Sequence, residues 1–582
     1  MSNRLYYGDN LDILREHVAD ESVDLIYLDP PFNSKRDYNL LFKTPKGQQS
    51  DAQITAFDDT WHWGPQAEAE FHQILKGPNT DVAEMMQALR KFLGENDMMA
   101  YLTMIANRLL QLQRVLKSTG SLYLHCDPTA SHYLKVVLDG VFGKINCRNE
   151  ISWKRSSAHS DTKQGMKRYG KIRDIIFFYT KSDGYAWTPQ YTPYDETYLE
   201  QEYRHLDSSG RRYKEADLTA AKPGGDVEYG WRVKRKLGSS ERWQEDLADE
   251  FRKPKKGWEY LEVRPYSGRY WAYGRKNLID FANQGKLIHR ETGMPRLKLF
   301  ADEMPGVSLQ DSWDDISPAS GDEDLGYPTQ KPIALLERII RASSKEGDIV
   351  LDPFCGCGTA VHAAQKLGRQ WIGIDVTHLA ISLIEKRMKN AFPYLQVVSP
   401  GTKKAAQVGP NAFEVVGVPR DIDGARDMFE RDPHQFQLWA CTLVGAQPYK
   451  GGRKGADSGI DGLVFPEVEK GKMEKVIVSV KGGKNVGVAM VRDLKGVIQR
   501  DKAAIGLFVT LTPPTKEMIK EAASAGFYES PLHGDYPCLQ ILTVEGLLEG
   551  KESAKFPDMA YGGQTFKKAK AENKTKDQGK LF

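Results

Sequence analysis

The stretch Val23-Asp24-Leu25-Ile26-Tyr27-Leu28-Asp29-Pro30-Pro31-Phe32 decides the fold of this chain. Its apolar first half predicts a buried strand. The two prolines cannot continue a strand or open a helix without strain, so the chain must leave the sheet there in an extended turn. Ligands of open α/β sheets bind at the carboxyl ends of the strands, which makes this turn a candidate site.

The turn offers three groups that suit a planar base with an exocyclic amine. The Asp29 carboxylate and the Pro30 carbonyl can each accept one N–H, and the Phe32 ring can stack on the base. The alternative is an aspartate that caps a helix beside a structural Pro-Pro turn, and these four residues alone would favour it. A second motif, more than 300 residues downstream, decides between the two.

The second motif joins two further predicted strands. The apolar run 348–351 leads into Asp352-Pro353-Phe354-Cys355-Gly356-Cys357-Gly358-Thr359, and a helix and a strand ending at Asp375 follow. Gly356 and Gly358 let the backbone approach a ligand closely, and Asp375 is placed to accept from both hydroxyls of a ribose. Because the phosphate-binding G-x-G-x-x-G pattern and a P-loop lysine are both absent, the ligand is nucleoside-like, and S-adenosylmethionine fits.

The overall composition restricts the class of protein to which these motifs can belong. A chain of 582 residues that is 40% hydrophobic and 27% charged predicts a soluble globular protein of two to four domains. Six cysteines without a C-x-x-C pair predict neither a disulfide framework nor a zinc site. No run of ~18 apolar residues occurs, so no membrane partner is expected, and the predicted location is the cytoplasm.

The region 148–325 differs from its flanks because lysine and arginine alternate with tyrosine and tryptophan. Seven of the eleven tryptophans lie between Trp153 and Trp313. Basic groups bind phosphates and aromatic faces stack on bases, which favours a nucleic-acid reader. An irregular subdomain with an aromatic core explains the same composition, and composition alone leaves both interpretations open.

The motifs together resemble the β class of amino-group DNA methyltransferases, in which a D-P-P-[YF] motif precedes the cofactor motif. The matching stretches are Tyr7-Gly8-Asp9-Asn10, 23–33, Gly326-Tyr327-Pro328-Thr329-Gln330-Lys331-Pro332, 350–359 and Ile372-Gly373-Ile374-Asp375. The resemblance implies an α/β fold: a permuted, seven-stranded, Rossmann-like sheet dependent on S-adenosylmethionine. It also implies double-stranded DNA as partner and a target-recognition region between the two halves.

The resemblance implies a role for each motif residue. Asp29, Pro30, Pro31 and Phe32 would be catalytic and would act on a flipped-out adenine at N6, because cytosine-N4 enzymes usually carry serine in place of Asp29. Cytosine N4 stays the alternative, since both bases present an amine. The implied cofactor-binding residues are Asp9, Lys331, Asp352, Phe354, Gly356, Gly358, Thr359 and Asp375.

Two further interpretations compete with this one. Methyltransferases of RNA or of protein glutamine usually place the cofactor motif before the catalytic turn and lack a long basic insert, so the order here argues against them. A DNA-binding protein with decayed sites is the other. The intact Asp29, Phe32 and Asp375 argue against decay in the first half of the chain.

The second half resembles the Mrr-like branch of the restriction-endonuclease superfamily. Asp461 opens one predicted strand, and Lys481 ends the next. An aspartate can bind Mg²⁺, and a lysine can orient the attacking water. Ser479 stands where an acidic residue or glutamine is usual, so Asp461 is the one firm ligand and Asp457 is the candidate for a second. A module that only binds DNA stays open. The pairing of the two domains suggests restriction–modification or phage defence.

The remaining expectations concern boundaries and partners. The tail ends in Gln578-Gly579-Lys580-Leu581-Phe582, which resembles the peptide that docks on the bacterial sliding clamp, and a homodimer is a further possible partner arrangement. The predicted order is a catalytic half, a target-recognition region, a cofactor half, a linker, an endonuclease-like domain and a disordered basic tail, at 1–147, 148–325, 326–395, 396–412, 413–555 and 556–582.

Overall fold

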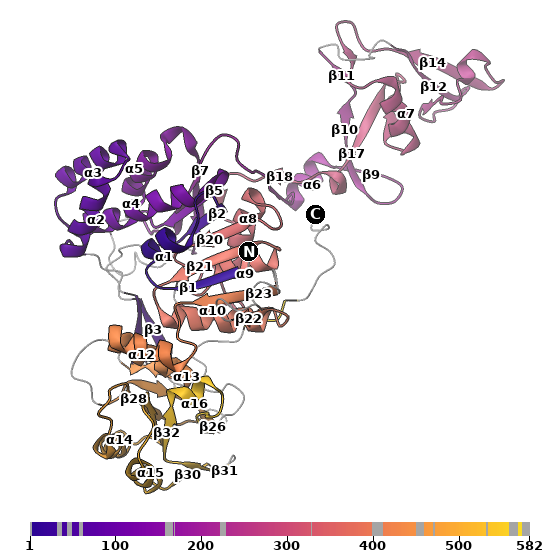
Figure 1. The fold of residues 1–582 in the computed structure, drawn as a ribbon. Coiled ribbons are helices and arrows are strands. Elements are labelled where there is room, and N and C mark those ends of the chain that lie inside the picture. Colours follow the sequence, from indigo (N-terminus) through magenta and orange to yellow (C-terminus); the bar gives the residue numbers. More distant parts are fainter. Residues whose placement is uncertain are drawn as a thin grey trace. The chain divides into compact units, whose positions relative to one another are not determined.

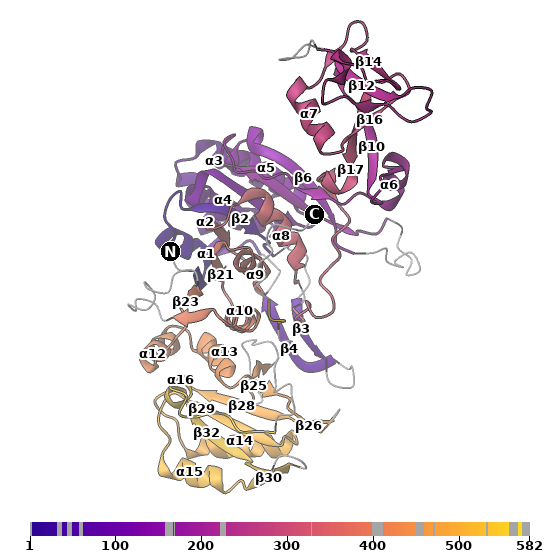
Figure 2. The same cartoon turned by 90° about the vertical axis from the view of Figure 1, so that its right-hand side faces the viewer.

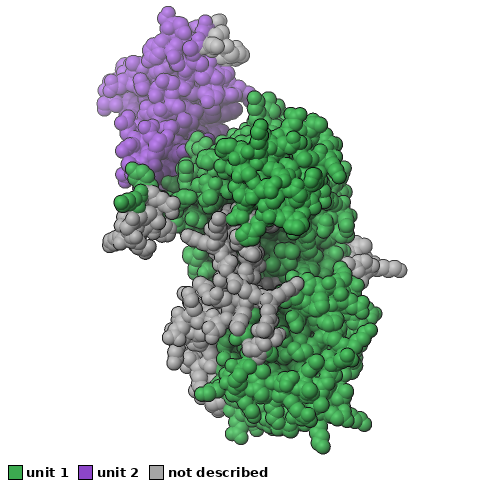
Figure 3. All heavy atoms as spheres, turned by 90° about the vertical axis from the view of Figure 1, so that its left-hand side faces the viewer, with its two compact units in different colours: residues 1–188, 310–574 green, residues 189–309, 575–582 purple. Residues whose placement is uncertain are grey.

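A computed structural model describes most of the chain. The described residues are 3–31, 38–43, 49–57, 62–156, 167, 169–221, 229–327, 329–398, 411–449, 459–469, 472–530, 534–557 and 569–572. Phe32, Asp457 and the segment Gln578–Phe582 lie outside them. The chain forms two compact units, one from residues 1–188 and 310–574 and the other from residues 189–309 (Figure 3).

A ten-stranded sheet organises the first unit (Figure 1). Its strands, in their order across the sheet, are β19 (Ser312–Trp313), β6 (Cys147–Lys154), β7 (Arg173–Thr180), β5 (Leu116–Cys126), β2 (Val23–Leu28), β20 (Ile349–Asp352), β21 (Gln370–Asp375), β1 (Asn3–Tyr7), β23 (Ala412–Val416) and β22 (Gln396–Val398).

The central seven strands, β6 to β1, form the predicted α/β sheet. Strand β7 runs antiparallel to both β5 and β6, and the other strand pairs of the sheet are parallel. Strand β2, which leads into the Asp29-Pro30-Pro31 turn, lies directly beside β20, although the two are more than 300 residues apart. The residues that follow β2, β20, β21 and β1 therefore meet at one edge of the sheet.

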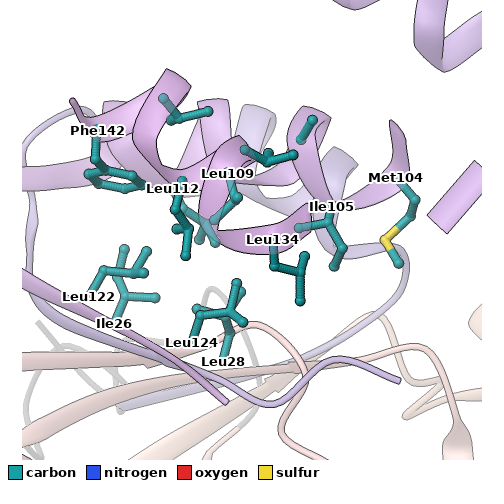
Figure 4. Close-up of a cluster of buried hydrophobic side chains, with 14 of the residues drawn as sticks. Ile26, Leu28, Met104, Ile105, Leu109, Leu112, Leu122, Leu124, Leu134 and Phe142 are labelled. Atoms are coloured by element: carbon teal, nitrogen blue, oxygen red, sulfur yellow. The ribbon is translucent and has the colours of Figure 1, made fainter. Parts of the chain in front are cut away.

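Helices cover both faces of the sheet. Side chains of successive strand residues point to opposite faces, so each strand packs against helices on both sides. Ile26 and Leu28 pack with Leu122 and Leu124 under helices α4 and α5 (Figure 4). Tyr123, which lies between Leu122 and Leu124 in β5, points to the other face. Its hydroxyl lies 2.8 Å from Ser343 Oγ of α8 there. Apolar runs without alternation are typical of such strands.

The other strands and the helices of this part of the unit include elements at 41–93, where the sequence shows no clear periodicity. They are α1 (Asn10–His17), β3 (Tyr38–Lys43), β4 (Gln49–Phe57), α2 (Pro65–Lys76), α3 (Thr80–Leu93), α4 (Asp97–Val115), α5 (Ser131–Phe142), α8 (Ile333–Ser343), α9 (Thr359–Lys366) and α10 (His378–Ala391). None of the helices among the described residues is long and apolar enough to span a membrane.

The sheet takes in residues that the sequence suggested for other parts. Strands β6, β7 and β19 fall inside 148–325, and β22 and β23 fall at 396–416, in the expected linker and the start of the last domain. The reason is local: 173–180 is one almost continuous apolar run, which the surrounding basic residues obscured. The compact unit that lies between the two halves in sequence spans residues 189–309.

The second unit is built from small antiparallel sheets around an aromatic core. Trp231, Trp243 and Trp271 are buried there. Together with the buried Trp153 and Trp313 of the first unit, five of the seven tryptophans serve packing, as the aromatic-core interpretation predicts. Its elements are β8 (Tyr191–Thr192), α6 (Glu196–Glu202), β9 (His205–Leu206), β10 (Arg212–Asp217), β11 (Thr219–Ala220), β12 (Trp231–Lys236), β13 (Gln244–Glu245), β14 (Trp258–Val263), β15 (Tyr270–Trp271), α7 (Arg275–Asn283), β16 (Leu287–His289), β17 (Pro295–Phe300) and β18 (Val307–Ser308).

A five-stranded sheet, β24-β25-β28-β29-β32, forms the C-terminal domain (Figure 2). Val476, Val478 and Val480 pack toward α12 and α13, whereas Ile477 packs toward α14. The elements are α12 (Ile422–Arg431), α13 (Pro433–Leu443), β24 (Gln447–Pro448), β25 (Gly462–Val464), β26 (Glu467–Glu469), β27 (Lys472–Met473), β28 (Val476–Lys481), α14 (Val488–Arg500), β29 (Ile505–Thr510), α15 (Lys516–Ala523), β30 (Phe527–Ser530), β31 (Gly534–Pro537), β32 (Leu539–Thr543) and α16 (Val544–Leu548).

Candidate active site

Three carboxylates mark the site, each at the end of a neighbouring parallel strand. Asp29 follows β2, Asp352 ends β20 and Asp375 ends β21. The structure therefore brings together the two motifs that the sequence places far apart. The position agrees with the rule that open α/β sheets bind ligands beyond the carboxyl ends of their strands.

Asp29 is paired with one of the predicted cofactor residues. The Lys331 ammonium forms an ion pair with Asp29 Oδ2, and both side chains are largely buried, with 10% and 17% of their surface exposed. The other oxygen, Asp29 Oδ1, is buried and has no hydrogen-bond partner within the described part of the chain. A buried acceptor without a donor is costly, so this oxygen is ready to accept from a ligand. Pro30 is buried beside it, and Pro31 is half-buried.

Asp352 and Asp375 hold the loop of the second motif. The Phe354 amide donates to Asp352 Oδ1 at 3.0 Å, and the Gly356 amide donates to Asp375 Oδ2 at 2.9 Å. Burial, reinforced by Asp29 and Asp375, holds the pKa of Asp352 well above its usual range, and burial also raises the pKa of Asp375. Burial and the neighbouring carboxylates thus disfavour the charged forms of these acids, and a cationic ligand such as a sulfonium would favour them.

The glycine turn has the left-handed backbone that its residues predict. Gly356 and Gly358 have φ of 49° and 77°. A Cβ on Gly358 would lie 2.8 Å from Ile384, whereas one on Gly356 would lie 3.5 Å from the ring of Tyr327. Thr359, the first residue of α9, is buried. The backbone thus closes tightly around the start of α9.

Asp9 reaches the same edge from β1. It caps helix α1 by accepting from the Leu11 amide at 2.7 Å, and Arg108 donates to both of its oxygens at 3.1 Å. Asn10 donates to the Pro353 carbonyl at 2.8 Å, which ties α1 to the loop of the second motif. Sequence reasoning found Asp9 but missed Arg108, because a lone arginine within an amphipathic helix gives no local signal.

The two cysteines of the loop are packing residues. Cys355 and Cys357 are buried and free, and burial raises the pKa of each thiol. A neutral, buried thiol is a poor nucleophile. The arrangement therefore suits direct transfer to a bound base, without a covalent enzyme intermediate.

In the C-terminal domain the structure brings Asp461 and Lys481 together. Lys481 Nζ lies 3.6 Å from Asp461 Oδ2, which also accepts from the Val480 amide at 2.6 Å. Ser479 Oγ lies 3.3 Å from the same oxygen. The described residues contain no group of three or more histidine, cysteine or acidic side chains that could hold a metal ion. Asp461 is thus the one carboxylate ligand that this part of the structure supplies.

Comparison with known proteins identifies both domains. Residues 23–386 match the model of the DNA methylase family, and residues 429–528 match the model of a restriction endonuclease family. The type II methyltransferase M.EcaI of Enterobacter cloacae is 27% identical over 390 residues, which cover 66% of this chain and 69% of that protein. The Mod subunit of the type III restriction-modification enzyme StyLTI of Salmonella typhimurium is 25% identical over 384 residues, 63% of this chain but half of that subunit.

Solved structures of low identity also match. The M1.HpyAVI–SAM complex is 14% identical, covers 67% of this chain and 99% of its own, and has a TM-score of 0.29. The cytosine-N4-specific PvuII DNA methyltransferase is 13% identical, with coverages of 71% and 96% and a TM-score of 0.30. On the family match, this chain belongs to the S-adenosylmethionine-dependent DNA methylase family and carries a restriction-endonuclease domain after its methyltransferase domain.

Proposed function

We propose that the chain methylates adenine at N6 in double-stranded DNA, with Asp29 and Pro30 as the groups that hold the amine. The observation that carries this proposal is the buried Asp29 Oδ1 without a donor, at the end of β2. An exocyclic amine supplies the N–H that this oxygen lacks. Serine would be the usual residue here for cytosine N4, so Asp29 favours adenine, and cytosine N4 is the alternative that the experiment must separate.

The mechanism follows from the acceptors at the turn. A duplex hides the amine in the base stack, so the adenine must leave the helix to reach the sheet edge. Asp29 and the Pro30 carbonyl then accept the two amine hydrogens and aim the nitrogen lone pair away from the turn. Phe32, which lies outside the described residues, is the proposed stacking ring. Transfer of the methyl group would break its bond to sulfur, leave S-adenosylhomocysteine as the product and put one surplus proton on N6, and the Asp29 carboxylate is the acceptor that this proton faces.

The cofactor fits the opposite side of the same edge. Bound S-adenosylmethionine supplies an electrophilic methyl group on a sulfonium, and the clustered carboxylates favour that positive charge. Asp375 would hold the ribose, Asp9 would lie near the adenine, and Phe354, Gly356, Gly358 and Thr359 would shape the pocket. Asp352 would support the loop, and Lys331 would orient Asp29 and limit the excess of negative charge.

Transfer of a labelled methyl group tests this proposal. Purified protein, DNA and tritiated S-adenosylmethionine should give labelled DNA, and Asp29→Ala should lower the rate by about 10²- to 10³-fold or more while cofactor affinity is kept. Asp20→Ala is the matched control, since Asp20 lies close to Asp29 in sequence and its side chain is 71% exposed. Retained transfer in the Asp29 variant would remove Asp29 from the mechanism.

The unit 189–309 is the proposed target reader. It interrupts the methyltransferase between its catalytic and cofactor halves, and one of its cavities, of about 640 Å³, is lined by Tyr213, Arg242, Trp243 and Lys298 among others. Cations and rings in one cavity suit phosphates and bases. A protein that acts on the chromosome would associate with the nucleoid, and two copies could act on the two strands of a site as a homodimer.

Magnesium-dependent DNA cleavage by the C-terminal domain is the second candidate function. The pairing of Asp461 with Lys481 at 3.6 Å carries it. Mg²⁺ is commonly held by one or two carboxylates together with substrate phosphates and water, so Asp461 meets the lower limit for a ligand set. Lys481 would stabilise developing negative charge. Restriction–modification or phage defence is the biological role in which the two activities belong together.

A cleavage assay separates a nuclease from a DNA-binding module. Plasmid DNA with Mg²⁺ should be cut by the wild type and left intact by Lys481→Ala, and Lys484→Ala, an exposed neighbour, should cut as the wild type does. Identical products from wild type and Lys481→Ala would leave only the binding module.

Sliding-clamp binding through Gln578–Phe582 stays a proposal, which a pull-down with the chain shortened by five residues tests.

A further inference from the structure

A short C-terminal segment returns from the restriction-endonuclease domain to the methyltransferase. Residues 569–572, here called the C-terminal strap, follow that domain in sequence and lie against α9 and α10. The Glu572 amide donates to the Ala391 carbonyl at 2.8 Å, and its carboxylate contacts His362 Nε2 at 3.0 Å and Lys366 Nζ at 3.3 Å. Sequence composition predicted a disordered tail for this region, whereas the strap makes defined contacts.

His362 connects the C-terminal strap to Arg387 in the interior. It is buried on α9, and burial lowers its pKa to about 4, so the ring is neutral near pH 7. Arg387 Nε points at His362 Nδ1 at 3.3 Å, and because an arginine can only donate, Nδ1 must be the acceptor. The ring proton therefore sits on Nε2, where it is donated to Glu572. The strap thus fixes the tautomer that Arg387 requires.

Arg387 in turn holds the loop of the second motif. Its Nη1 donates to the Cys357 carbonyl at 2.9 Å and to Thr359 Oγ1 at 3.3 Å. The guanidinium is only 2% exposed, and burial lowers its pKa. The acceptors that it contacts, on His362, Cys357 and Thr359, are all neutral. A buried cation needs a nearby anion, and the carboxylates whose charge acts on it are those of Glu323 and Glu572.

We infer that Glu572 is a positioning residue for cofactor binding, which acts through His362 and Arg387 on the backbone at Cys357 and Thr359. The inference rests on the proposed cofactor-binding role of Gly358 and Thr359. Without Glu572, His362 loses the acceptor that fixes its tautomer, and Arg387 loses part of its charge compensation. The turn at the start of α9 then samples conformations that do not bind the cofactor, so affinity falls and the chemical step does not.

Variants of the full-length protein test this inference through the affinity for S-adenosylmethionine. Glu572→Ala, and a chain that ends at residue 568, should raise the KM and the Kd for the cofactor by about tenfold, with kcat at saturating cofactor within about twofold of wild type. Glu572→Gln keeps an acceptor but loses the charge, so its loss should be intermediate. Lys570→Ala, on the exposed side of the strap, and a chain that ends at residue 574 are the controls and should match wild type.

A double-mutant cycle checks the route. If Glu572 acts through His362, the double variant Glu572→Ala/His362→Gln should bind the cofactor less than about twofold more weakly than His362→Gln alone. Wild-type affinity in Glu572→Ala, equal losses in Lys570→Ala, or independent and multiplying losses in the cycle would each overturn the inference. A wild-type protein that binds no S-adenosylmethionine would instead contradict the proposed function, so the two failures are distinct.

Discussion

Lys331 forms an ion pair with Asp29, although 302 residues separate them in sequence. The pair joins the segment just before α8 to the turn that follows β2. It places one positive charge beside Asp29, whose charge acts on the buried Asp352. The proposed catalytic residues and the proposed cofactor-binding residues are therefore electrostatically coupled, and changes in either are expected to alter both binding and rate.

Lys331→Met should lower the rate of methyl transfer. Loss of the ammonium leaves Asp29 Oδ2 largely buried without its ion-pair partner, so the orientation of the Asp29 carboxylate is no longer fixed. We expect kcat to fall by about tenfold or more, because a misplaced acceptor no longer aims the amine. Lys331→Arg is the control that keeps the charge. Equal kcat values in wild type and Lys331→Met would show that the pair does not position Asp29.

Gly358→Ala should weaken cofactor binding more than Gly356→Ala. The added Cβ at Gly358 would lie 2.8 Å from Ile384 at a φ of 77°, whereas at Gly356 it would meet Tyr327 at 3.5 Å. Strain of about 1–3 kcal/mol at the first position corresponds to a loss of roughly tenfold or more in affinity. Isothermal titration with S-adenosylmethionine measures it. Equal affinities for the two variants would contradict the tight closure of the turn.

His378→Phe should make stability less dependent on pH. His378 is buried, stacks on Tyr7 with ring centres 3.7 Å apart, and burial lowers its pKa to about 3. An unfolded histidine binds its proton near pH 6.5, so the folded state loses stability as the pH falls from 6.5 toward 3, by up to about 1.4 kcal/mol per unit. Phenylalanine keeps the stacking and removes the titration. The thermal midpoint of the variant should therefore exceed that of wild type by more at pH 5.5 than at pH 8.

The opposite result in that experiment is informative. If the difference between the two midpoints is the same at both pH values, His378 does not titrate between the folded and unfolded states. Its ring nitrogens have no hydrogen-bond partner among the described residues, so no contact there would offset the expected effect.

Arg242→Ala combined with Lys298→Ala should weaken DNA binding without changing the affinity for S-adenosylmethionine. Both side chains line the cavity of the unit 189–309. Each phosphate contact that is lost lowers the slope of log K against log salt by about 0.9, so the double variant should lose up to about 1.8. Lys286→Ala is the control, because its ammonium is already paired with Glu303 at 2.6 Å. An unchanged salt slope would place the DNA elsewhere.

The sequence predicts those parts of the site whose backbone conformation is set by neighbouring residues. A strand followed by Pro-Pro at 29–31, and a strand followed by a glycine turn at 352–359, fix their own backbone and therefore the places of Asp29, Asp352 and Asp375. Five of the seven central strands of the sheet, β1, β2, β5, β20 and β21, could be predicted for the same reason. Their apolar runs are short, and each is bounded by turn residues.

Other features could not be predicted because they depend on contacts between distant segments. Nothing near Arg387 or His362 in the sequence shows that they join the loop to Glu572. Likewise, the pairing of Lys331 with Asp29 appears only when β2 and β20 lie side by side. The place of β7 in the sheet was missed for a different reason, since its apolar run carries a clear strand signal that basic neighbours outweighed.

Identification of the modified base tests the central claim most directly. DNA from cells that express the wild-type chain, and from cells that express Asp29→Ala, would be digested to nucleosides and analysed by mass spectrometry. The account predicts N6-methyladenine with the wild type and none above background with the variant. N4-methylcytosine in the wild-type DNA, or equal amounts of N6-methyladenine in both samples, would contradict it.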